Sequence, residues 1–315
     1  MVGRFSSLSP TMDKLRAFKK GYEKQGYRVV GQNSAVKVCL WTKKSLLGSG
    51  DCYKSKFYGI ASWRCLQMTP SLFHCTHRCL FCWRKVEATL DLGSELPPDD
   101  PEEIIERCII AQRELLSGFK GNPHVNMRKW SEAQHPNNAA ISLAGEPTMY
   151  EKLGDLLEEF HRRDFTTFLV TNGTMPERLK GMETEPTQLY ITLPAPDRDT
   201  YVKVCRPRIA DGWERLNESL ELMKSFSCRR VLRLTLVRGL SLRSPEAYAR
   251  LIDKAQPDFI EPKAYFPVGY SRSRLGPSFM PAHEEIRKFA AELEKFTGYT
   301  IVDESEKSRV VLLKA

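Results

Sequence analysis

Cys75-Thr76-His77-Arg78-Cys79-Leu80-Phe81-Cys82-Trp83 places three thiols, in the spacing C-x3-C-x2-C, on one short loop. Sulfurs this close along the chain can converge on a single metal centre. A structural zinc site or an ordinary four-iron ferredoxin site takes four protein ligands, whereas this loop offers three. One iron of a bound cluster would therefore remain open to chelation by the amino and carboxylate groups of a small molecule.

Two other interpretations of the loop are a zinc knuckle, with His74 or His77 as fourth ligand, and part of a disulfide framework. The three-thiol spacing favours the cluster over zinc. A chain with nine cysteines must leave at least one thiol unpaired, and no secretory signal precedes them. The thiols are therefore expected to be ligands or core residues in a reducing compartment, the cytoplasm.

The spacing, together with an aromatic residue just before the last cysteine, resembles the radical S-adenosylmethionine (SAM) enzymes. The resemblance implies that Cys75, Cys79 and Cys82 hold a 4Fe-4S cluster whose open iron binds SAM. In that family the bound SAM is cleaved reductively to a 5′-deoxyadenosyl radical. Phe81 would lie against the adenine ring of SAM.

A second cysteine pattern lies upstream, where Cys39, Cys52 and Cys65 are separated by twelve residues each time. No helix or strand period produces this spacing. Cysteine is also a common buried residue, so the pattern can arise by coincidence. Beside the first three thiols, it favours a second 4Fe-4S cluster with an open iron of its own.

The composition is that of a soluble protein with a basic surface. The 315 residues can form one large barrel or two ordinary domains, and no apolar run approaches the length of a membrane span. The formal net charge of +9 suggests a polyanionic partner such as nucleic acid, although a generally basic proteome explains it equally. No membrane association is expected.

Strands and helices alternate through most of the chain. Hydrophobic patterns predict strands at residues 66–74, 139–144, 166–171, 189–193, 231–237 and 259–265, and helices at 150–163, 176–182, 213–226 and 245–255, after one that runs from Asp99 or Asp100 to Gly118. Six repeats of strand then helix imply a parallel sheet. We therefore predict an α/β fold, a partial (β/α)6 TIM-type barrel of the radical SAM kind, with catalytic groups where strands end.

Three domains are expected along the chain. Residues 1–65 form an N-terminal extension with the auxiliary-cluster ligands, residues 66–265 the partial barrel, and residues 266–315 the C-terminal part. The C-terminal part is predicted to hold a helix at 280–297 and a closing hairpin of strands at 299–303 and 309–313.

The extension and one insertion have weaker patterns. A loose tail before Thr11 precedes a basic helix at about 12–25 and two short strands, at 27–31 and 35–41. Residues 120–138 are polar and include Arg128, Lys129 and Trp130, so they are predicted to form a surface insertion, either plain or in contact with RNA.

Functional side chains are expected where the strands end. Gly145, Glu146 and Pro147 follow one strand, and the radical SAM family has a related motif there that hydrogen-bonds the SAM ammonium group through backbone oxygens and the glutamate. Asn172 follows the next strand; it either tolerates a left-handed turn or hydrogen-bonds the SAM carboxylate or ribose. Arg233 lies in a strand, where a buried arginine needs an anion, and the SAM carboxylate is one candidate.

Six stretches, colinear from about Tyr27 to the C-terminus, resemble one family within the superfamily, the tRNA 4-demethylwyosine synthases. They are Cys52-Tyr53-Lys54-Ser55-Lys56-Phe57-Tyr58-Gly59, Cys79-Leu80-Phe81-Cys82-Trp83-Arg84, Ser142-Leu143-Ala144-Gly145-Glu146-Pro147-Thr148, Pro186-Thr187-Gln188-Leu189-Tyr190, Val268-Gly269-Tyr270-Ser271 and Asp303-Glu304-Ser305-Glu306-Lys307-Ser308-Arg309-Val310. So many separate matches make chance similarity a poor explanation.

The resemblance implies a lyase that converts N1-methylguanosine, next to the anticodon of phenylalanine tRNA, into tricyclic 4-demethylwyosine with two carbons from pyruvate. Cys39, Cys52 and Cys65 match the family's auxiliary-cluster ligands. Lys54 matches the lysine proposed there to hold pyruvate as a Schiff base. A lysine desolvated between cationic neighbours can lose its proton and attack a ketone, whereas a solvated Lys54 would only carry charge.

Two departures from the family pattern limit what is carried over. Leu193-Pro194-Ala195-Pro196 stands where an acidic residue is common, so no role is assigned to it. The flavodoxin-like extension of eukaryotic members is absent, so the electron is expected to come from an external ferredoxin or flavodoxin, and the protein is expected to be a monomer. Two alternatives remain: radical chemistry on a peptide or small metabolite, and a non-catalytic, metal-stabilised RNA-binding protein.

Overall fold

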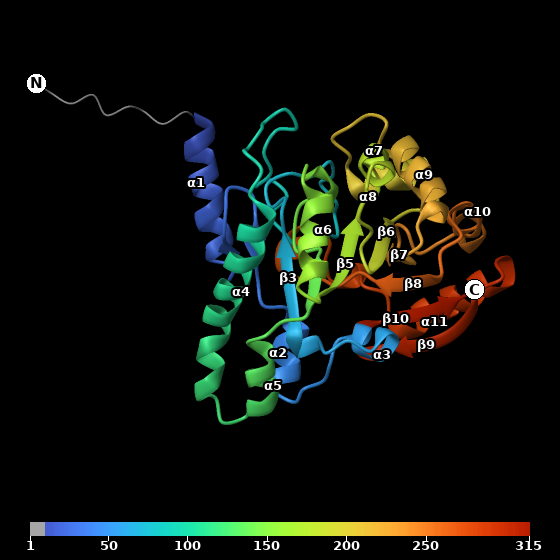
Figure 1. Ribbon diagram of the computed structural model, residues 1–315. Helices are drawn as coiled ribbons and strands as arrows, with labels where there is room; N and C mark the ends of the chain where they lie inside the picture. Colours follow the sequence, from blue (N-terminus) through green and yellow to red (C-terminus); the bar gives the residue numbers. More distant parts are fainter. Residues whose placement is uncertain (1–9) are drawn as a thin grey trace, which may run out of the picture.

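A ten-stranded sheet organises the part of the chain that the computed structural model describes, residues 10–315. Its six central strands are parallel and follow one another in chain order (Figure 1). They are β3 (Cys65–Thr69), β4 (Asn138–Ile141), β5 (Thr166–Thr171), β6 (Gln188–Leu193), β7 (Arg229–Leu236) and β8 (Phe259–Ala264). The predicted six-stranded partial barrel is confirmed, because parallel strands in sequential order with helical crossovers are its defining topology.

Helices cover one face of this curved sheet (Figure 1). They are α4 (Pro101–Ser117), α6 (Leu153–Arg162), α7 (Pro176–Lys180), α9 (Gly212–Leu222), α10 (Pro245–Ala255) and α11 (His283–Phe296). Among them, α4 packs against α6, α7 against α9, α9 against α10, and α10 against α11. The alternation along a strand decides which side chains meet them: Leu232, Leu234 and Leu236 of β7 enter the core with the helices. The intervening residues of each strand therefore face the inside of the barrel.

Both edges of the parallel sheet are extended by antiparallel strands. β1 (Arg28–Val29) and β2 (Ala35–Val36) continue it beyond β3, and β10 (Val310–Lys314) and β9 (Thr300–Ser305) continue it beyond β8. The predicted C-terminal hairpin is thus present. The sheet runs unbroken across both predicted domain boundaries, and the division into three domains stays a prediction.

The N-terminal segment differs most from the sequence prediction. The basic helix is present as α1 (Pro10–Glu23), whereas the tail before it lies outside the described residues. The strand predicted at 35–41 ends at Val36, and α2 (Leu40–Leu46) begins directly after Cys39. A second short helix, α3 (Tyr53–Tyr58), begins directly after Cys52. Helices of two turns or fewer show too little periodicity to be recognised in a sequence.

Two other segments also differ. The strand predicted at 66–74 ends at Thr69, and the residues after it form the cysteine loop. The predicted surface insertion contains α5 (Met127–Ala133), whose N-cap residue Asn126 accepts a hydrogen bond from the backbone N–H of Lys129. Within residues 10–315, no helix is both long and apolar enough to cross a membrane.

Candidate active site

The cysteine loop lies beyond the carboxyl end of β3 and is pinned by the end of α8 (Arg198–Cys205), a helix that the sequence patterns did not predict. The backbone N–H of Arg78 donates to the carbonyl of Cys205 at 3.0 Å, and that of Leu80 donates to the carbonyl of Val204 at 2.9 Å. These bonds fix the direction of the loop, and so the direction of its thiols.

The three thiols of this loop share one buried site. Burial raises the pKa of Cys75 to about 12 and also raises that of Cys82, and the neighbouring Cys79 adds to both increases. Thiols with such pKa values become ligands only when a metal displaces their protons. Three neighbouring thiols on one loop, of which Cys75 is buried and Cys79 and Cys82 are partly buried, with no fourth cysteine of the same loop, fit a 4Fe-4S cluster that keeps one iron free.

A buried cation stands beside these thiols. Arg84 is only 2 % exposed and donates a hydrogen bond to the hydroxyl of Thr89. Although burial alone would lower its pKa, the thiolates of Cys75 and Cys82 raise it. Arg84 thus supplies a permanent positive charge that offsets part of the negative charge of a thiolate-bound cluster.

The two histidines of the zinc interpretation have other partners. The ring nitrogens of His74 lie 2.8 Å from Asn33 Nδ2 and 2.8 Å from the carbonyl oxygen of Ser94, so neither is free to bind metal. His77 Nε2 lies 2.6 Å from the hydroxyl of Tyr201. The structure thus argues against His74 as a zinc ligand, whereas His77 lies close to the sulfurs of Cys79 and Cys205.

Cys205 is a residue of the site that the sequence did not reveal. Its sulfur is within 4.8 Å of Cys79 Sγ and of a ring nitrogen of His77, and a hydrogen bond with Cys205, followed by burial, raises the pKa of Cys79. No spacing rule could have found it, because Cys205 comes from α8, far along the chain. Hydrogen bonds to ligand sulfurs are one means by which proteins set cluster potentials.

Gly145 allows the next strand end to approach the cysteine loop. Its φ is +71°, and a Cβ atom there would overlap the backbone oxygen of Ser71. The backbone N–H of Glu146 donates to the carbonyl of His74 at 2.8 Å, directly before the first loop cysteine. Only glycine fits this combination of a left-handed conformation and backbone contact.

Replacing Gly145 by alanine is therefore expected to lower the free energy of unfolding by more than about 2 kcal/mol and to weaken SAM binding. Urea unfolding and equilibrium dialysis of SAM would measure both. The matched control is Gly154→Ala in α6, where an added Cβ meets no atom within 4 Å. In the control, the free energy of unfolding should rise by up to about 1 kcal/mol. Equal stability and equal SAM binding of the two variants would contradict the role given to Gly145.

Glu146 and Asn172 meet where β4 and β5 end. The buried Glu146 carboxylate accepts hydrogen bonds from Thr171 Oγ1 at 2.6 Å and from the backbone N–H of Asn172 at 2.8 Å. Asn172 Nδ2 donates to Thr76 Oγ1 at 2.9 Å and lies 3.9 Å from Cys75 Sγ. Pro147 begins a short 3₁₀ helix after Glu146. The structure thus brings these predicted SAM-binding residues against the cysteine loop.

Phe81 and Arg233 occupy different places. Phe81, half-buried, packs with Val237 and Tyr265 at the ends of β7 and β8. Arg233 is not among the residues that touch the cysteine loop: it points inward from the middle of β7 and pairs with Glu261. The anion that its burial requires is therefore supplied by the protein, and contact of either residue with SAM stays a prediction.

Lys54 lies on the inside of the barrel, about half-way along the strands. Its ammonium group is 4.2 Å from the ring centroid of Phe168 and 4.4 Å from that of Tyr190, which are the third residues of β5 and β6. Lys54 is 9 % exposed, and burial, followed by the charge of Arg233, lowers its pKa to about 8. This lysine therefore loses its proton far more readily than an exposed one.

A buried carboxylate organises the surroundings of Lys54. Glu261, 0 % exposed, accepts hydrogen bonds from the hydroxyls of Tyr53 at 3.0 Å, Tyr58 at 2.7 Å and Tyr190 at 3.2 Å, and pairs with Arg233 at 3.1 Å. The tyrosines come from α3 and β6, so Glu261 ties the N-terminal segment to the barrel. No sequence pattern predicted this set of contacts, because the partners are distant along the chain.

Replacing Glu261 by alanine should cost about 3–5 kcal/mol of stability, because it leaves Arg233 buried without an anion. Asp258→Ala is the matched control. Asp258 directly precedes β8, the strand that contains Glu261, and it also pairs with an arginine, Arg230, but its side chain is 37 % exposed. That loss should stay below about 1 kcal/mol. Chemical denaturation measures the free energy of unfolding of both variants. Similar small losses would show that Glu261 does not hold the N-terminal segment to the barrel.

Cys39, Cys52 and Cys65 come together beside Lys54. Burial raises the pKa of Cys52 to about 11 and also raises that of Cys65; the neighbouring Cys39 adds to both increases, and Lys54 opposes them. Cys39 and Cys52 precede the first turns of α2 and α3, and Cys65 begins β3. Three converging thiols fit a second cluster with three protein ligands.

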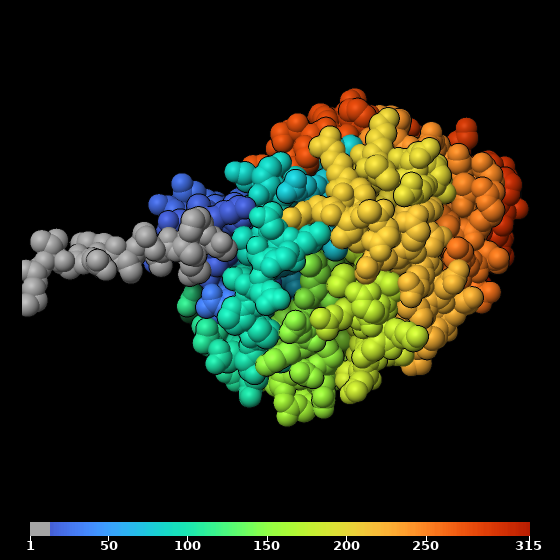
Figure 2. Space-filling view, turned by 90° about the horizontal axis from the view of Figure 1, so that it is seen from above, coloured from blue at the N-terminus to red at the C-terminus, as the bar shows by residue number. Residues whose placement is uncertain are grey.

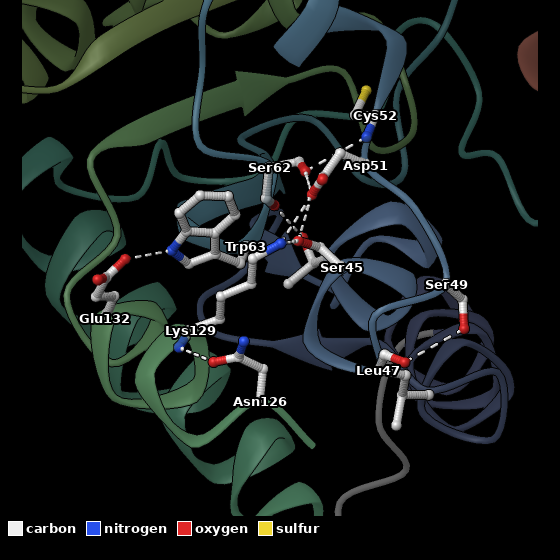
Figure 3. Close-up of polar contacts among 11 residues, drawn as sticks. Ser45, Leu47, Ser49, Asp51, Cys52, Ser62, Trp63, Asn126, Lys129 and Glu132 are labelled. Carbon is white, nitrogen blue, oxygen red and sulfur yellow. Dashed lines mark hydrogen bonds and ion pairs between the residues drawn. The ribbon is translucent and has the colours of Figure 1, made fainter. Parts of the chain in front are cut away.

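Helix α5 braces the loop that carries Cys52 (Figure 3). The Cys52 backbone N–H donates to Ser62 Oγ at 3.3 Å, and Ser62 Oγ donates to Asp51 at 2.9 Å. Lys129 of α5 pairs with Asp51 at 3.4 Å and lies over the ring of Trp63. Lys129, considered above for RNA contact, is thus directed into the fold.

A three-cysteine loop at the carboxyl ends of a six-stranded parallel barrel is the arrangement of radical SAM enzymes, and this chain is one of them: the Radical SAM superfamily matches residues 70–252. The Wyosine base formation family matches residues 254–315. The S-adenosyl-L-methionine-dependent tRNA 4-demethylwyosine synthase of Pyrococcus abyssi is 57 % identical over 298 residues, which cover 93 % of this chain and 86 % of that protein. The chain belongs to the tRNA 4-demethylwyosine synthase family, as the sequence motifs indicated.

Other relatives agree with this assignment. The synthase of Methanocaldococcus jannaschii is 39 % identical, over 92 % of this chain and 93 % of its own. The solved structure described as TYW1 with a lysine-pyruvate adduct bound has a TM-score of 0.85 and 37 % identity, and the match covers 95 % of both chains. The crystal structure of archaeal TYW1 gives a TM-score of 0.77, with 34 % identity.

Proposed function

We propose that this enzyme converts N1-methylguanosine in the anticodon loop of phenylalanine tRNA into 4-demethylwyosine, with pyruvate as the source of two carbons. Family membership supports the reaction, and the surroundings of Lys54 are the structural observation that supports the use of pyruvate. Within residues 10–315, Lys54 Nζ forms no hydrogen bond or ion pair, and two aromatic rings flank it. An unpaired, buried amine is suited to attack the ketone carbon of pyruvate.

The enzyme uses SAM and a 4Fe-4S cluster, as its superfamily does. Cys75, Cys79 and Cys82 would hold this cluster, with Glu146 and Asn172 beside it to orient SAM. When bound, the cluster and SAM supply a 5′-deoxyadenosyl radical, which takes a hydrogen atom from the N-methyl group of the base. A cluster of aromatic and aliphatic side chains on the inside of the barrel, among them Phe168, Tyr190 and Val231, would help to exclude water and competing hydrogen donors.

The neutral amine of Lys54 would attack the carbonyl carbon of pyruvate, and the carbonyl oxygen leaves as water, so that a Schiff base forms. Arg233 helps to keep that amine neutral, because a second positive charge nearby disfavours protonation. The carbon radical on the base would then add to the former carbonyl carbon of pyruvate. The carboxyl carbon would leave as carbon dioxide, and the one electron released with it balances the one that SAM cleavage consumes. The exocyclic amine of the base would displace the Lys54 amine and close the ring, so that the pyruvate methyl carbon becomes a substituent of the new ring. We further propose a second 4Fe-4S cluster on Cys39, Cys52 and Cys65, an external one-electron donor and a monomeric enzyme in the cytoplasm.

The test is an anaerobic assay of reconstituted enzyme with SAM, dithionite, pyruvate and tRNA that carries N1-methylguanosine. Digested nucleosides are analysed by mass spectrometry, and a tricyclic nucleoside should appear only when pyruvate is present. Formation of 5′-deoxyadenosine with an unchanged base would move the reaction to a peptide or small metabolite. Zinc in place of iron, with no SAM cleavage, would indicate a non-catalytic RNA-binding protein.

A further inference from the structure

A basic hollow of about 680 Å³ lies on the outer side of the cysteine loop. The loop residues and the segment after α8 lie side by side there, as the bridge between His77 and Pro207 shows, and Figure 2 shows these parts of the chain in cyan and yellow. The hollow is lined by Arg78, Val86, Glu87, Val202, Arg206, Pro207 and Arg208.

One wall of the hollow is bonded directly to residues of the cysteine loop. Arg208 Nη1 donates to the carbonyl of Cys75 at 3.2 Å, and the Arg208 backbone N–H donates to the carbonyl of Thr76 at 2.8 Å. Arg78 belongs to the loop itself. A molecule that occupies the hollow would therefore contact residues that belong to the cysteine loop or are hydrogen-bonded to it.

The charges of the hollow are largely unpaired. Within residues 10–315, the side chains of Arg78 and Arg206 form no ion pair, and that of Arg208 has only a distant partner, Asp91 at 3.7 Å. Arg78 and Arg206 are exposed to solvent. Arg208 is mostly buried and also donates to the carbonyls of Cys75 and Leu90. Two exposed guanidinium groups, those of Arg78 and Arg206, against one lining carboxylate, Glu87, make a site for an acidic partner.

Part of the lining of the hollow is apolar, which favours a protein over RNA as that partner. Val202 is 47 % exposed there, beside Val86 and Pro207. Apolar residues surrounded by arginines are typical of protein interfaces. Single-stranded RNA is instead bound on aromatic side chains that stack with its bases, and none of the lining residues is aromatic.

We infer that this hollow docks a small acidic one-electron carrier protein, which reduces the cluster held by Cys75, Cys79 and Cys82. The inference rests on the proposed function, since reductive SAM cleavage needs an electron. The carrier, a reduced flavodoxin or ferredoxin, loses one electron and the cluster gains it; no bond is made or broken in the transfer. Opposite charges speed such encounters and orient them, without requiring a large interface.

The experiment compares Arg206→Glu and Val202→Glu, two exposed lining residues of the hollow outside the cysteine loop, with a control on the exposed face of α11. The control is Lys288→Glu, which makes the same charge change as Arg206→Glu. Binding of a fluorescently labelled acidic flavodoxin is measured by anisotropy over a range of salt concentrations. Its reoxidation by the enzyme is followed by stopped-flow absorbance. Formation of 5′-deoxyadenosine is measured separately with dithionite, a small reductant that needs no docking site.

Both hollow variants should weaken flavodoxin binding and slow its reoxidation by about tenfold or more, with a flatter salt dependence. Arg206→Lys should restore most of the loss, and Lys288→Glu should behave as the wild type. With dithionite, all variants should cleave SAM and modify tRNA at the wild-type rate.

Three results would overturn the inference. Unchanged flavodoxin binding and reoxidation would exclude the hollow as the docking site and leave the proposed reaction intact. Loss of the dithionite-driven reaction would place Arg206 or Val202 in the catalytic machinery. Loss of tRNA affinity with normal flavodoxin binding would make the hollow an RNA site. Failure of the proposed function itself is distinct, because the wild type would then yield no tricyclic nucleoside even with dithionite.

Discussion

Replacing Cys79 by alanine is expected to abolish the formation of 5′-deoxyadenosine from SAM. The remaining thiols, Cys75 and Cys82, cannot hold a cluster that needs three protein ligands and an open iron. Reconstituted Cys79→Ala should therefore lose about four irons per chain relative to the wild type. Iron analysis and chromatography of SAM digests measure the two effects independently.

Cys108→Ala is the control for this experiment, because it also removes a thiol, but one that lies outside both cysteine clusters. Cys108 is completely buried among apolar side chains of α4 and its neighbours. The variant should lose about 1 kcal/mol of stability and keep both iron and SAM cleavage. Normal 5′-deoxyadenosine yield from Cys79→Ala would contradict the assignment of the loop as the cluster site.

Elements with long, regular patterns could be predicted from the sequence. The strand at 166–171 and the helix at 245–255 have the predicted bounds, because several buried positions repeat at the strand or helix period. Helices α2, α3 and α5 could not be predicted, since six or seven residues show little periodicity. Their positions depend on distant contacts, such as that between Lys129 and Asp51.

The residues of the candidate site likewise fall into two groups, those that local sequence patterns predict and those that only long-range packing brings together. Short-range spacing identified the cysteine loop, and the strand ends placed Glu146 and Asn172 next to it. The partner of Arg233 was not predictable, because Glu261 becomes its neighbour only through the register of β7 and β8. Cys205 and the arginine hollow likewise arise from the packing of α8 against the loop, which no local pattern encodes.

Replacing Lys54 by methionine is expected to eliminate the tricyclic product while SAM cleavage continues. Methionine is nearly as long as lysine and can pack between the rings of Phe168 and Tyr190, so the variant should still fold. Without the amine no Schiff base can form with pyruvate, and product formation should fall by at least ~10³-fold. Nucleoside analysis and 5′-deoxyadenosine yield, measured on the same samples, separate the two steps.

Lys263 is the lysine against which Lys54 must be tested, because burial and Arg233 lower its pKa to about 8 as well. The two differ in their contacts: Lys263 Nζ donates to the carbonyl of Ser308 at 2.7 Å, whereas Lys54 Nζ forms no such bond within residues 10–315. Borohydride reduction in the presence of pyruvate, followed by peptide mass spectrometry, should therefore label Lys54 in the wild type and in Lys263→Met. Labelling of Lys263, or an adduct that survives in Lys54→Met, would assign the pyruvate site to the other lysine.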